Sequence, residues 1–493
     1  MKYIKISIVI LLVSFISIFA YKLTTNNSNN KMSLTKEQMK EMLSYTIDGN
    51  KTSSMPSKGS GYKVKSITCK SGSILSWDND NWLLEVEKLE SEDLCNIDFT
   101  TGTGSYTVTA VPSIAGSLDS TSKTTTENGT VTFYTKLVID SVSGCTNEIS
   151  DGKVIVKNVT SNTTCNINVS YMKLYDKLLA DKSTKLTRTD FSKVLTDNNT
   201  NTLYTSTEDS KTVYYFAGNA TDNWVKFGKN ASNQDLYWRI IRTNSDGGVR
   251  LLYHGTSTTT DNAYIGTSKF NTEYNDPMYV GYMYGTSGSL VNNRTNATNS
   301  TIKGVIDTWY KNNLNTNYGK YISTTAVYCN DRSNPAGGYN TGNTSFYYGA
   351  YTRLKTNKTP SYDCATTEDK FTADSSTGNG KLTYPIALMT ADEVAFAGGV
   401  YGKEAPTWYY KNSANGSSTG STYWWLLSPS YWSGSNAFVF LVYGSSYPGF
   451  LNDYVYGTFG VRPAISLKSC VKTSGGDGSA NAPYTIEEST TGC

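Results

Sequence analysis

Residues 423–467 read YWWLLSPSYWSGSNAFVFLVYGSSYPGFLNDYVYGTFGVRPAISL. Tyr, Trp, Phe, Gly, Ser and Asn dominate this stretch, and from residue 433 onward its only charged side chains are those of Asp453 and Arg462. Rigid aromatic rings mixed with small polar residues are typical of recognition surfaces. A catalytic centre needs titratable groups, which this stretch nearly lacks, so it favours binding over turnover.

The composition narrows the class of protein. The length of 493 residues predicts roughly two to four domains. Lys plus Arg number 44 and Asp plus Glu 41, and the net charge of +3 gives no strong field for nucleic acid. The single histidine, His254, leaves little scope for histidine acid–base chemistry or zinc ligation. We therefore expect no cofactor, no metal site and no nucleic-acid partner.

The N-terminus carries a basic and then an apolar segment. Lys2 and Lys5 lead into a mostly apolar run over residues 6–21. As a helix this run is about 24 Å long, slightly short of a hydrocarbon core of about 30 Å. The pattern of residues 1–23 therefore predicts either a transmembrane helix or a cleaved signal peptide. A cleavage site needs two small residues in an A-x-A-like arrangement, and Ala20 meets this requirement whereas Ile18 does not. Both readings place the bulk of the chain outside the cell, and the first makes it a single-pass protein of the cell membrane.

The eight cysteines fall in local pairs along the chain. An even number of cysteines in an exported chain predicts disulfides. Metal binding is disfavoured because no Cys-x-x-Cys occurs and no histidine lies nearby, while reduced, buried thiols are the alternative. The expected disulfides are Cys69–Cys95, Cys145–Cys165, Cys329–Cys364 and Cys470–Cys493.

The first third of the chain contains an internal repeat. Residues 24–60 are polar and predict a stalk, and residues 61–103 and 104–171 predict two small all-β modules. In each module a strand leads to a cysteine, and a later Cys-Asn-Ile opens another strand, where the alternation Asn166-Ile167-Asn168-Val169 is the period-two signal. The modules resemble the small β-repeats of bacterial surface proteins such as the listeria type, most closely in NVTSNTTCNINV at 158–169. That resemblance implies spacers or weak binders.

The sequence after residue 171 predicts a linker, a head domain and a C-terminal tail. Residues 172–210 carry one helical pattern, residues 211–470 form the head, and residues 471–493 form a tail. In the head, residues 301–314 have apolar side chains at helical spacing, and residues 390–397 start with Thr390 and Glu393 at capping-box spacing. Strand-like runs occupy 212–218, 236–243, 423–427, 437–442 and 461–467. We therefore predict an α+β head with two helices among short antiparallel strands.

The head resembles the C-type-lectin fold, in the branch that contains the formylglycine-generating sulfatase-modifying enzymes. The residues that carry the resemblance are YWWLLSP at 423–429 and GVRPA at 460–464. YWRII, TADEV, WWLLSPS and GVRPAISLK, in this order, also resemble a group of Gram-positive surface proteins. The enzymes need a reactive cysteine pair late in the domain, and no cysteine lies between Cys364 and Cys470, which implies a non-catalytic relative. In the hypervariable receptors of diversity-generating retroelements, which share this fold, the variable residues occupy the place of residues 431–456.

We therefore expect a bacterial cell-surface recognition protein without enzymatic activity, whose head binds a glycan or protein ligand on a host or neighbouring cell. One alternative is a cell-envelope enzyme that acts on glycans through acidic residues, with Asp392 and Glu393 as the candidate pair. Their place in the first turn of a helix is better explained by capping and the helix dipole. The other alternative is a structural surface-layer component.

The expected ligand surface lies near residues 431–456. Between residues 442 and 459 the strand pattern breaks into Gly-Ser-Ser and Pro-Gly turns, so aromatic rings there have little core to enter. Exposed aromatic clusters usually mark a binding site. The predicted ligand-binding residues are Tyr431, Trp432, Asn436, Tyr443, Tyr447, Phe450, Asn452, Asp453, Tyr454 and Tyr456.

Overall fold

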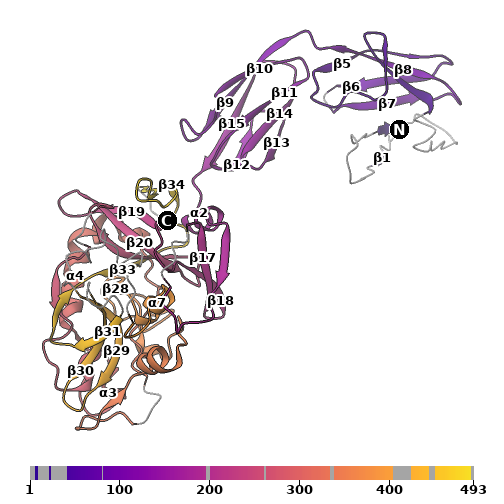
Figure 1. Ribbon diagram of the computed structural model, residues 1–493. Helices are drawn as coiled ribbons and strands as arrows, with labels where there is room; N and C mark the ends of the chain where they lie inside the picture. Colours follow the sequence, from indigo (N-terminus) through magenta and orange to yellow (C-terminus); the bar gives the residue numbers. More distant parts are fainter. Residues whose placement is uncertain are drawn as a thin grey trace, which may run out of the picture. The chain divides into compact units, whose positions relative to one another are not determined.

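The computed structural model describes residues 6–8, 21–23, 41–79, 81–195, 200–259, 263–333, 338–403, 423–443, 450–489 and 493. The chain forms two compact units, residues 1–170 and residues 171–493 (Figure 1). Strands hold 41% of the residues and helices 14%, and the strands form many small sheets. The expected α+β class with a C-type-lectin-like head is therefore wrong, because the protein is mostly β.

The expected N-terminal transmembrane helix is also not found. None of the described helices is long and apolar enough to cross a membrane. Most of residues 1–23 lie outside the described residues, and the two described pieces are short strands, β1 (Ile6–Ile8) and β2 (Tyr21–Leu23).

The first unit contains two β-modules of related topology. In the first module the sheet order is β4-β3-β8-β5, and in the second it is β10-β9-β15-β12. Each of these sheets has a parallel pair at its centre, β3 with β8 and β9 with β15. A second layer holds β7 with β6 in one module and β11, β14 and β13 in the other. The strands are β3 (Leu43–Ile47), β4 (Asn50–Thr52), β5 (Tyr62–Cys69), β6 (Ile74–Asp78), β7 (Leu83–Lys88), β8 (Cys95–Thr101), β9 (Ser105–Pro112), β10 (Ser122–Thr126), β11 (Gly129–Tyr134), β12 (Val138–Ser143), β13 (Asn147–Ser150), β14 (Lys153–Val159) and β15 (Thr163–Ser170).

The first module starts earlier than expected. Strands β3 and β4 lie in the predicted stalk, yet β3 pairs in parallel with β8 and places Leu43 opposite Cys95. The sequence around β3 is polar, and its partner β8 lies about fifty residues later in the chain, so no local pattern indicates that β3 belongs to the sheet.

The head occupies residues 171–493 and is built on two sheets. The larger sheet has ten strands, with β16-β17-β18-β20-β19-β35-β34 along one path and β21, β33 and β28 joined to it through β20. Its strands are β16 (Thr184–Thr187), β17 (Thr202–Glu208), β18 (Lys211–Tyr215), β19 (Trp224–Lys229), β20 (Asp235–Thr243), β21 (Val249–Gly255), β28 (Ile386–Leu388), β33 (Pro463–Leu467), β34 (Thr473–Gly475) and β35 (Tyr484–Ile486).

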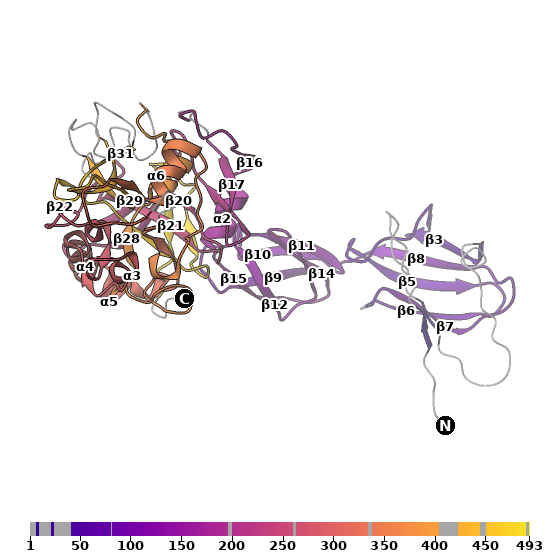
Figure 2. The same ribbon diagram turned by 90° about the horizontal axis from the view of Figure 1, so that it is seen from below.

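The smaller sheet has six strands in the order β22-β32-β29-β30-β31, with β26 also paired to β29. In two views related by a 90° turn, β29 and β31 lie at the end of the head away from helix α2 (Figures 1 and 2). The strands are β22 (Thr267–Lys269), β26 (Phe346–Tyr347), β29 (Trp424–Trp432), β30 (Ala437–Val442), β31 (Phe450–Tyr454) and β32 (Thr458–Gly460), and two further pairs are β23 (Met283–Tyr284) with β24 (Thr298–Asn299) and β25 (Tyr328–Cys329) with β27 (Lys370–Phe371).

The helices of the head are short. Both expected helices are present, as α4 (Thr301–Asn313) and α7 (Ala391–Phe396), and Ser300 caps α4 by accepting a hydrogen bond from the Lys303 amide. The expected capping box of Thr390 and Glu393 is confirmed. The other helical segments are α2 (Leu174–Asp181), α3 (Leu290–Asn293), α5 (Asn315–Tyr318), α6 (Gly349–Tyr351), the 3-10 turns η1 (Pro277–Val280), η2 (Gly319–Tyr321) and η4 (Thr367–Asp369), and the π-helical turn η3 (Thr352–Asn357).

The expected linker and tail are parts of the head. Leu174 and Leu178 of α2 are buried in the core of the head, and β17 joins the ten-stranded sheet. Strand β35, in the expected tail, pairs in parallel with β19 and places Tyr484 opposite Val225. The core of the head therefore needs segments from both of its chain ends.

All eight cysteines are joined in disulfides, and the pairs are those that the sequence suggests: Cys69–Cys95, Cys145–Cys165, Cys329–Cys364 and Cys470–Cys493.

Candidate functional site

Aromatic rings cross the six-stranded sheet from strand to strand. The strand register places Tyr347 of β26 opposite Tyr431 of β29, Tyr431 opposite Phe438 of β30, and Phe438 opposite Tyr454 of β31. The corresponding ring centroids are 5.8, 4.1 and 4.3 Å apart. Directly opposed side chains on one face of a sheet pack together. The register thus assembles four rings from four strands into a line.

Further rings extend this line at both ends. Tyr456 stacks on Tyr454 at 5.2 Å, and Tyr274 lies 4.6 Å from Tyr456. At the other end Tyr351 of α6 stacks on Tyr347 at 4.3 Å, and Tyr401 lies 5.6 Å from Tyr351. We call the following residues the aromatic row: Tyr274, Tyr347, Tyr351, Tyr401, Tyr431, Phe438, Tyr454 and Tyr456.

Among the described residues of the head, most of the large apolar or aromatic side chains that are exposed belong to the aromatic row. Among the described residues of the head, six large apolar or aromatic side chains are exposed, and the two outside the row are Leu186 and Val291. The other four belong to the row: Tyr274 is 42% exposed, Tyr347 40%, and Tyr454 and Tyr456 38% each. An exposed aromatic cluster is costly in water and usually marks a binding site.

The stacking decides which part of each ring a ligand can reach. The ring planes of Tyr431 and Phe438 are 15° apart, those of Tyr347 and Tyr351 17°, and those of Tyr454 and Tyr456 26°. Rings stacked in this way cover each other's faces, so they present edges and phenolic hydroxyl groups.

The Tyr431 hydroxyl is a hydrogen-bond donor at neutral pH. Burial, followed by the effect of Tyr454 and Tyr351, raises the pKa of Tyr431 to about 12. The phenol therefore stays protonated over the whole physiological range.

One end of the aromatic row is polar. The Lys355 ammonium group donates a hydrogen bond to the Tyr351 hydroxyl, and its nitrogen lies 4.8 Å from the ring centroid of Tyr351 and 5.6 Å from that of Tyr401. A cation at such distances is attracted by the ring faces. Asn452 donates from Nδ2 to the Tyr401 hydroxyl at 2.8 Å. This end therefore combines a cation, an amide and two phenols.

The structure brings together four of the ten predicted ligand-binding residues. Tyr431, Tyr454 and Tyr456 belong to the aromatic row, and Asn452 contacts it through Tyr401. The β30–β31 register places Asn452 and Tyr454, two residues apart, on the same face of the sheet, and Tyr431 reaches that face because it lies opposite Phe438.

Other predicted residues lie elsewhere. Trp432 is only 1% exposed and donates from Nε1 to the Gly342 carbonyl, so it is a core residue. It follows Tyr431 directly, and strand alternation turns it to the opposite face. Tyr443 packs against Tyr423 at 4.2 Å, away from the row.

Asn436 and Asp453 also do not contribute to the row. Asn436 lies in the turn between β29 and β30, where its Nδ2 donates to the Ser435 hydroxyl. Asp453 lies opposite Val439, on the face that is turned away from Tyr454, and burial raises the pKa of its carboxyl group. Tyr447 and the side chain of Phe450 lie outside the described residues.

Five of the eight residues of the aromatic row were not predicted. Tyr347 and Tyr351 come from FYYGAY at 346–351, a second stretch rich in Tyr and Gly whose composition was a usable signal. Phe438 and Phe440 lie on the same face of β30 and both are buried, and the sequence does not say which of the two stacks on Tyr431. Tyr274 and Tyr401 are isolated tyrosines in loops and gave no signal.

A second cluster, of buried charges, surrounds Glu393 of α7. Its carboxylate lies 2.7 Å from Arg250 and 3.0 Å from Arg242, and Arg242 also lies 2.7 Å from Glu208. Burial alone would raise the pKa of the Glu393 carboxyl group, but the charges of Arg250 and Arg242 outweigh it and hold that pKa below its ordinary value. Glu393 is therefore an ionised partner of two arginines at neutral pH.

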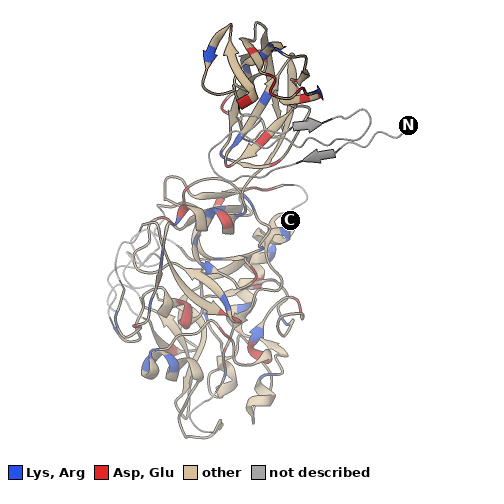
Figure 3. Ribbon diagram, turned by 90° about the vertical axis from the view of Figure 1, so that its right-hand side faces the viewer, with Lys and Arg blue, Asp and Glu red and all other residues tan. Residues whose placement is uncertain are grey.

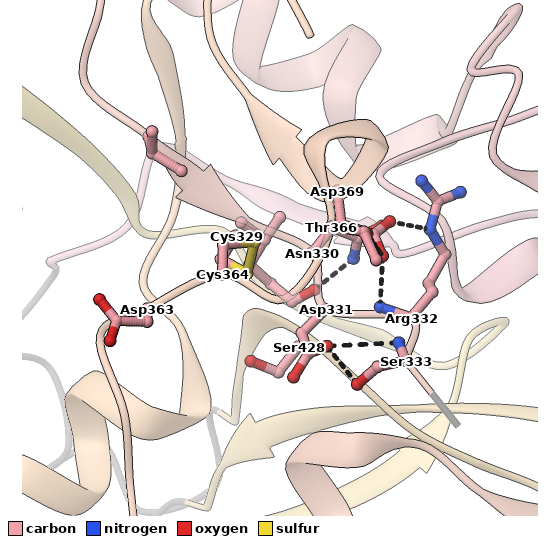
Figure 4. Close-up of a disulfide and its surroundings, with 12 residues drawn as sticks. Cys329, Asn330, Asp331, Arg332, Ser333, Asp363, Cys364, Thr366, Asp369 and Ser428 are labelled. Atoms are coloured by element: carbon pink, nitrogen blue, oxygen red, sulfur yellow. Dashed lines mark hydrogen bonds and ion pairs between the residues drawn. A yellow bond between two sulfur atoms is a disulfide. The ribbon is translucent and has the colours of Figure 1, made fainter. Parts of the chain in front are cut away.

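Asp392 and Asp331 are paired in the same way. Arg353 of η3 binds Asp331 at 2.8 Å and Asp392 at 2.7 Å. These groups line a cavity of about 20 Å³ beside the Cys329–Cys364 disulfide. Figure 4 shows that disulfide with Asp331 nearby and with Arg332 bonded to Asp369, another buried pair at 2.6 Å. A general acid needs a raised pKa and access to substrate, whereas carboxylates bound to arginine are suited to holding loops together.

Residues 267–469 match a family model described as a domain of unknown function (DUF6273). The matched region covers less than half of the chain and contains the whole aromatic row, Glu393, and Arg353 with its partners Asp331 and Asp392, whereas Arg242, Arg250 and Glu208 lie before it. No curated protein and no solved structure matches the chain. These comparisons thus provide no relative for the lectin or sulfatase-modifying resemblance.

Proposed function

We propose that the head is a recognition module that binds a glycan across the aromatic row. The observation that carries this proposal is the line of rings from β26, β29, β30 and β31, in which Tyr347 and Tyr454 are exposed, Tyr431 is half-buried and Phe438 packs beneath them. Neighbouring strands are about 4.8 Å apart, so the line covers about 14 Å over these four strands. That length suits an extended chain of several units better than a small compact molecule.

The chemistry of the row favours a glycan. Ring edges supply apolar contact for the C–H groups of a sugar, and the hydroxyl of Tyr431 and the other phenols supply hydrogen bonds for its OH groups. Tyrosine combines both at a low cost in conformational entropy. A protein ligand with the same alternation of apolar and polar groups is the competing occupant, and the experiment below includes it.

We also propose that the head acts outside the cell and without turnover. Four disulfides support an oxidising compartment. The two β-modules suit a spacer that precedes the head in the chain. The arginine pairing of Asp392 and Glu393 supports a stabilising role for these carboxylates rather than a role in glycan cleavage.

The test is binding of the immobilised full-length chain to a glycan array and, in parallel, to a panel of extracellular proteins. Tyr431→Ala and Tyr454→Ala should each lower affinity for a bound glycan by about 2 kcal/mol, roughly thirtyfold. The matched control is Tyr134→Ala, because Tyr134 is 54% exposed in the second β-module and lies outside the row.

The melting temperature of each variant separates binding from folding. Loss of binding with an unchanged melting temperature supports the row as the site. Wild-type affinity in both row variants would refute the proposal, and tyrosine-dependent binding of a protein alone would replace the glycan by that protein.

A further inference from the structure

Three lysines gather at the Tyr401 end of the aromatic row. Lys355 contacts the rings of Tyr351 and Tyr401 directly. Lys358 follows three residues later, at the end of η3, and Lys403 lies two residues after Tyr401. We call Lys355, Lys358 and Lys403 the lysine trio.

The hydrogen-bond partners of the lysine trio are neutral. Lys355 donates to the Tyr351 hydroxyl, Lys358 to the Leu354 carbonyl and Lys403 to the Ser192 carbonyl. Within the described parts of the chain none of the three forms an ion pair with a carboxylate. Elsewhere on the ribbon of the head, basic and acidic residues are interspersed (Figure 3). A local excess of positive charge thus adjoins the Tyr351–Tyr401 end of the aromatic row.

The three charges act on one another. Burial, and then the charges of Lys403 and Lys355, lower the pKa of Lys358. Mutual repulsion of this kind is relieved when an anion binds among the ammonium groups. Lys355 is also held in place by its contacts with two rings, so less side-chain entropy is lost when it meets a ligand.

We infer that the ligand of the aromatic row is an acidic polysaccharide, whose sugar rings lie along the row and whose anionic groups meet the lysine trio. This inference rests on the proposed function, because it names the class of glycan for the same surface. A neutral glycan would use the rings and leave the lysine trio unmatched. Carboxylate and phosphate groups share the chemistry that the lysines recognise, so both are tested.

The experiment compares acidic polymers with neutral counterparts on the full-length chain. The carboxylate pair is polygalacturonate and its full methyl ester, and the phosphate pair is a phosphomannan and its dephosphorylated form. At about 0.01 M ionic strength an acidic polymer should bind about tenfold or more tightly than its neutral counterpart, and the preference should shrink at about 0.15 M.

Two triple variants locate the charge effect. The variant Lys355→Gln/Lys358→Gln/Lys403→Gln should lose the preference for the acidic polymer. The control Lys51→Gln/Lys70→Gln/Lys136→Gln removes the same charge from exposed positions of the β-modules and should keep it.

The outcomes distinguish failure of the acidic-polysaccharide inference from failure of the proposed function. Equal binding of acidic and neutral polymers, an unchanged preference in the lysine-trio variant, or no binding of either acidic polymer would overturn the inference. If the inference fails in one of these ways, the proposed function still holds when neutral polymers bind the wild-type chain and do not bind Tyr431→Ala. Acidic polymers that bind through the lysine trio but ignore Tyr431→Ala and Tyr454→Ala would overturn the proposed function instead.

Discussion

Glu393 serves the head in two ways at once. Its Oε2 accepts a hydrogen bond from the Thr390 amide at 2.9 Å, and its Oε1 lies between the guanidinium groups of Arg242 and Arg250. The capping role follows from the spacing of two residues within one turn, so the sequence predicts it. The arginines precede Glu393 by 151 and 143 residues and meet only because β20 and β21 place them opposite each other. Local sequence therefore predicts the cap and misses the ion pairs.

The substitution Glu393→Gln should destabilise the head strongly. It keeps the shape of the side chain but leaves two buried guanidinium groups without this anion, and breaking a buried pair costs about 3–5 kcal/mol. Denaturant unfolding of the full-length chain measures the loss. Glu127→Gln is the control, because Glu127 pairs with Lys63 on a partly exposed surface, where the loss should stay below about 1 kcal/mol. Similar losses in both variants would contradict this account of Glu393.

The same charges predict how stability depends on pH. The folded-state pKa values of Glu393 and Glu208 are held below the ordinary value of 4.5, against the effect of burial, by the neighbouring arginines. A depressed pKa contributes stability that is present above 4.5 and is lost as the pH falls through the folded-state value. The melting temperature of the head should therefore drop below about pH 4.5, and less steeply in Glu393→Gln. Calorimetry from pH 7 to pH 3 checks this, and equal slopes in the two proteins would contradict it.

At the scale of elements, the aromatic row shows what a strand pattern can and cannot reveal. Tyr431 and Trp432 are neighbours of similar character, yet alternation leaves Tyr431 half-buried in the aromatic row and buries Trp432 completely. Composition predicts that both contribute to recognition, and only the pairing of β29 with β30 separates them. Strand β26 joins the same sheet from a segment some eighty residues earlier, which no local pattern indicates. The sequence therefore points to the strands that carry part of the aromatic row but does not identify the members of the row.

Phe438 lies between Tyr431 and Tyr454, so replacing it tests whether ring stacking stabilises the aromatic row. Phe438→Leu keeps an apolar side chain in β30 and removes the ring that contacts both neighbours. Loss of the ring pairs should destabilise the head by about 0.5–1.5 kcal/mol per pair and should weaken ligand binding, because Tyr431 and Tyr454 lose their fixed orientation. Thermal unfolding and glycan binding are the measurements. Phe227→Leu is the control, because Phe227 is a buried ring of β19 whose two ring contacts, to Tyr318 and Tyr321, lie outside the row. An equal loss of glycan binding there would argue against a special role for Phe438.

At the scale of the whole molecule, the sequence is informative where partners are close in the chain. The disulfide pairs follow from short separations, and α4 and α7 follow from helical spacing and caps. Strands of two or three residues, such as β25 and β27, show no periodicity, and their pairing is set by distant segments. The α+β expectation failed because such strands were counted as loops. The expected tail was assigned outside the head for the same reason, because β34 and β35 have three residues each and β35 pairs with the distant β19.

The C-terminal residues 471–493 give the last test, because they were expected as a tail and instead complete the head. Val471, Tyr484 and Ile486 are buried, and β35 pairs with β19. Deleting residues 471–493 should therefore abolish the cooperative unfolding transition of the head. Cys470→Ser/Cys493→Ser removes only the disulfide that closes this segment and should cost about 3 kcal/mol, as loops of this length do. Because the β-modules form a separate compact unit, their own transition serves as the internal control in calorimetry. A head that unfolds cooperatively without residues 471–493 would show that β34 and β35 are dispensable additions to the sheet.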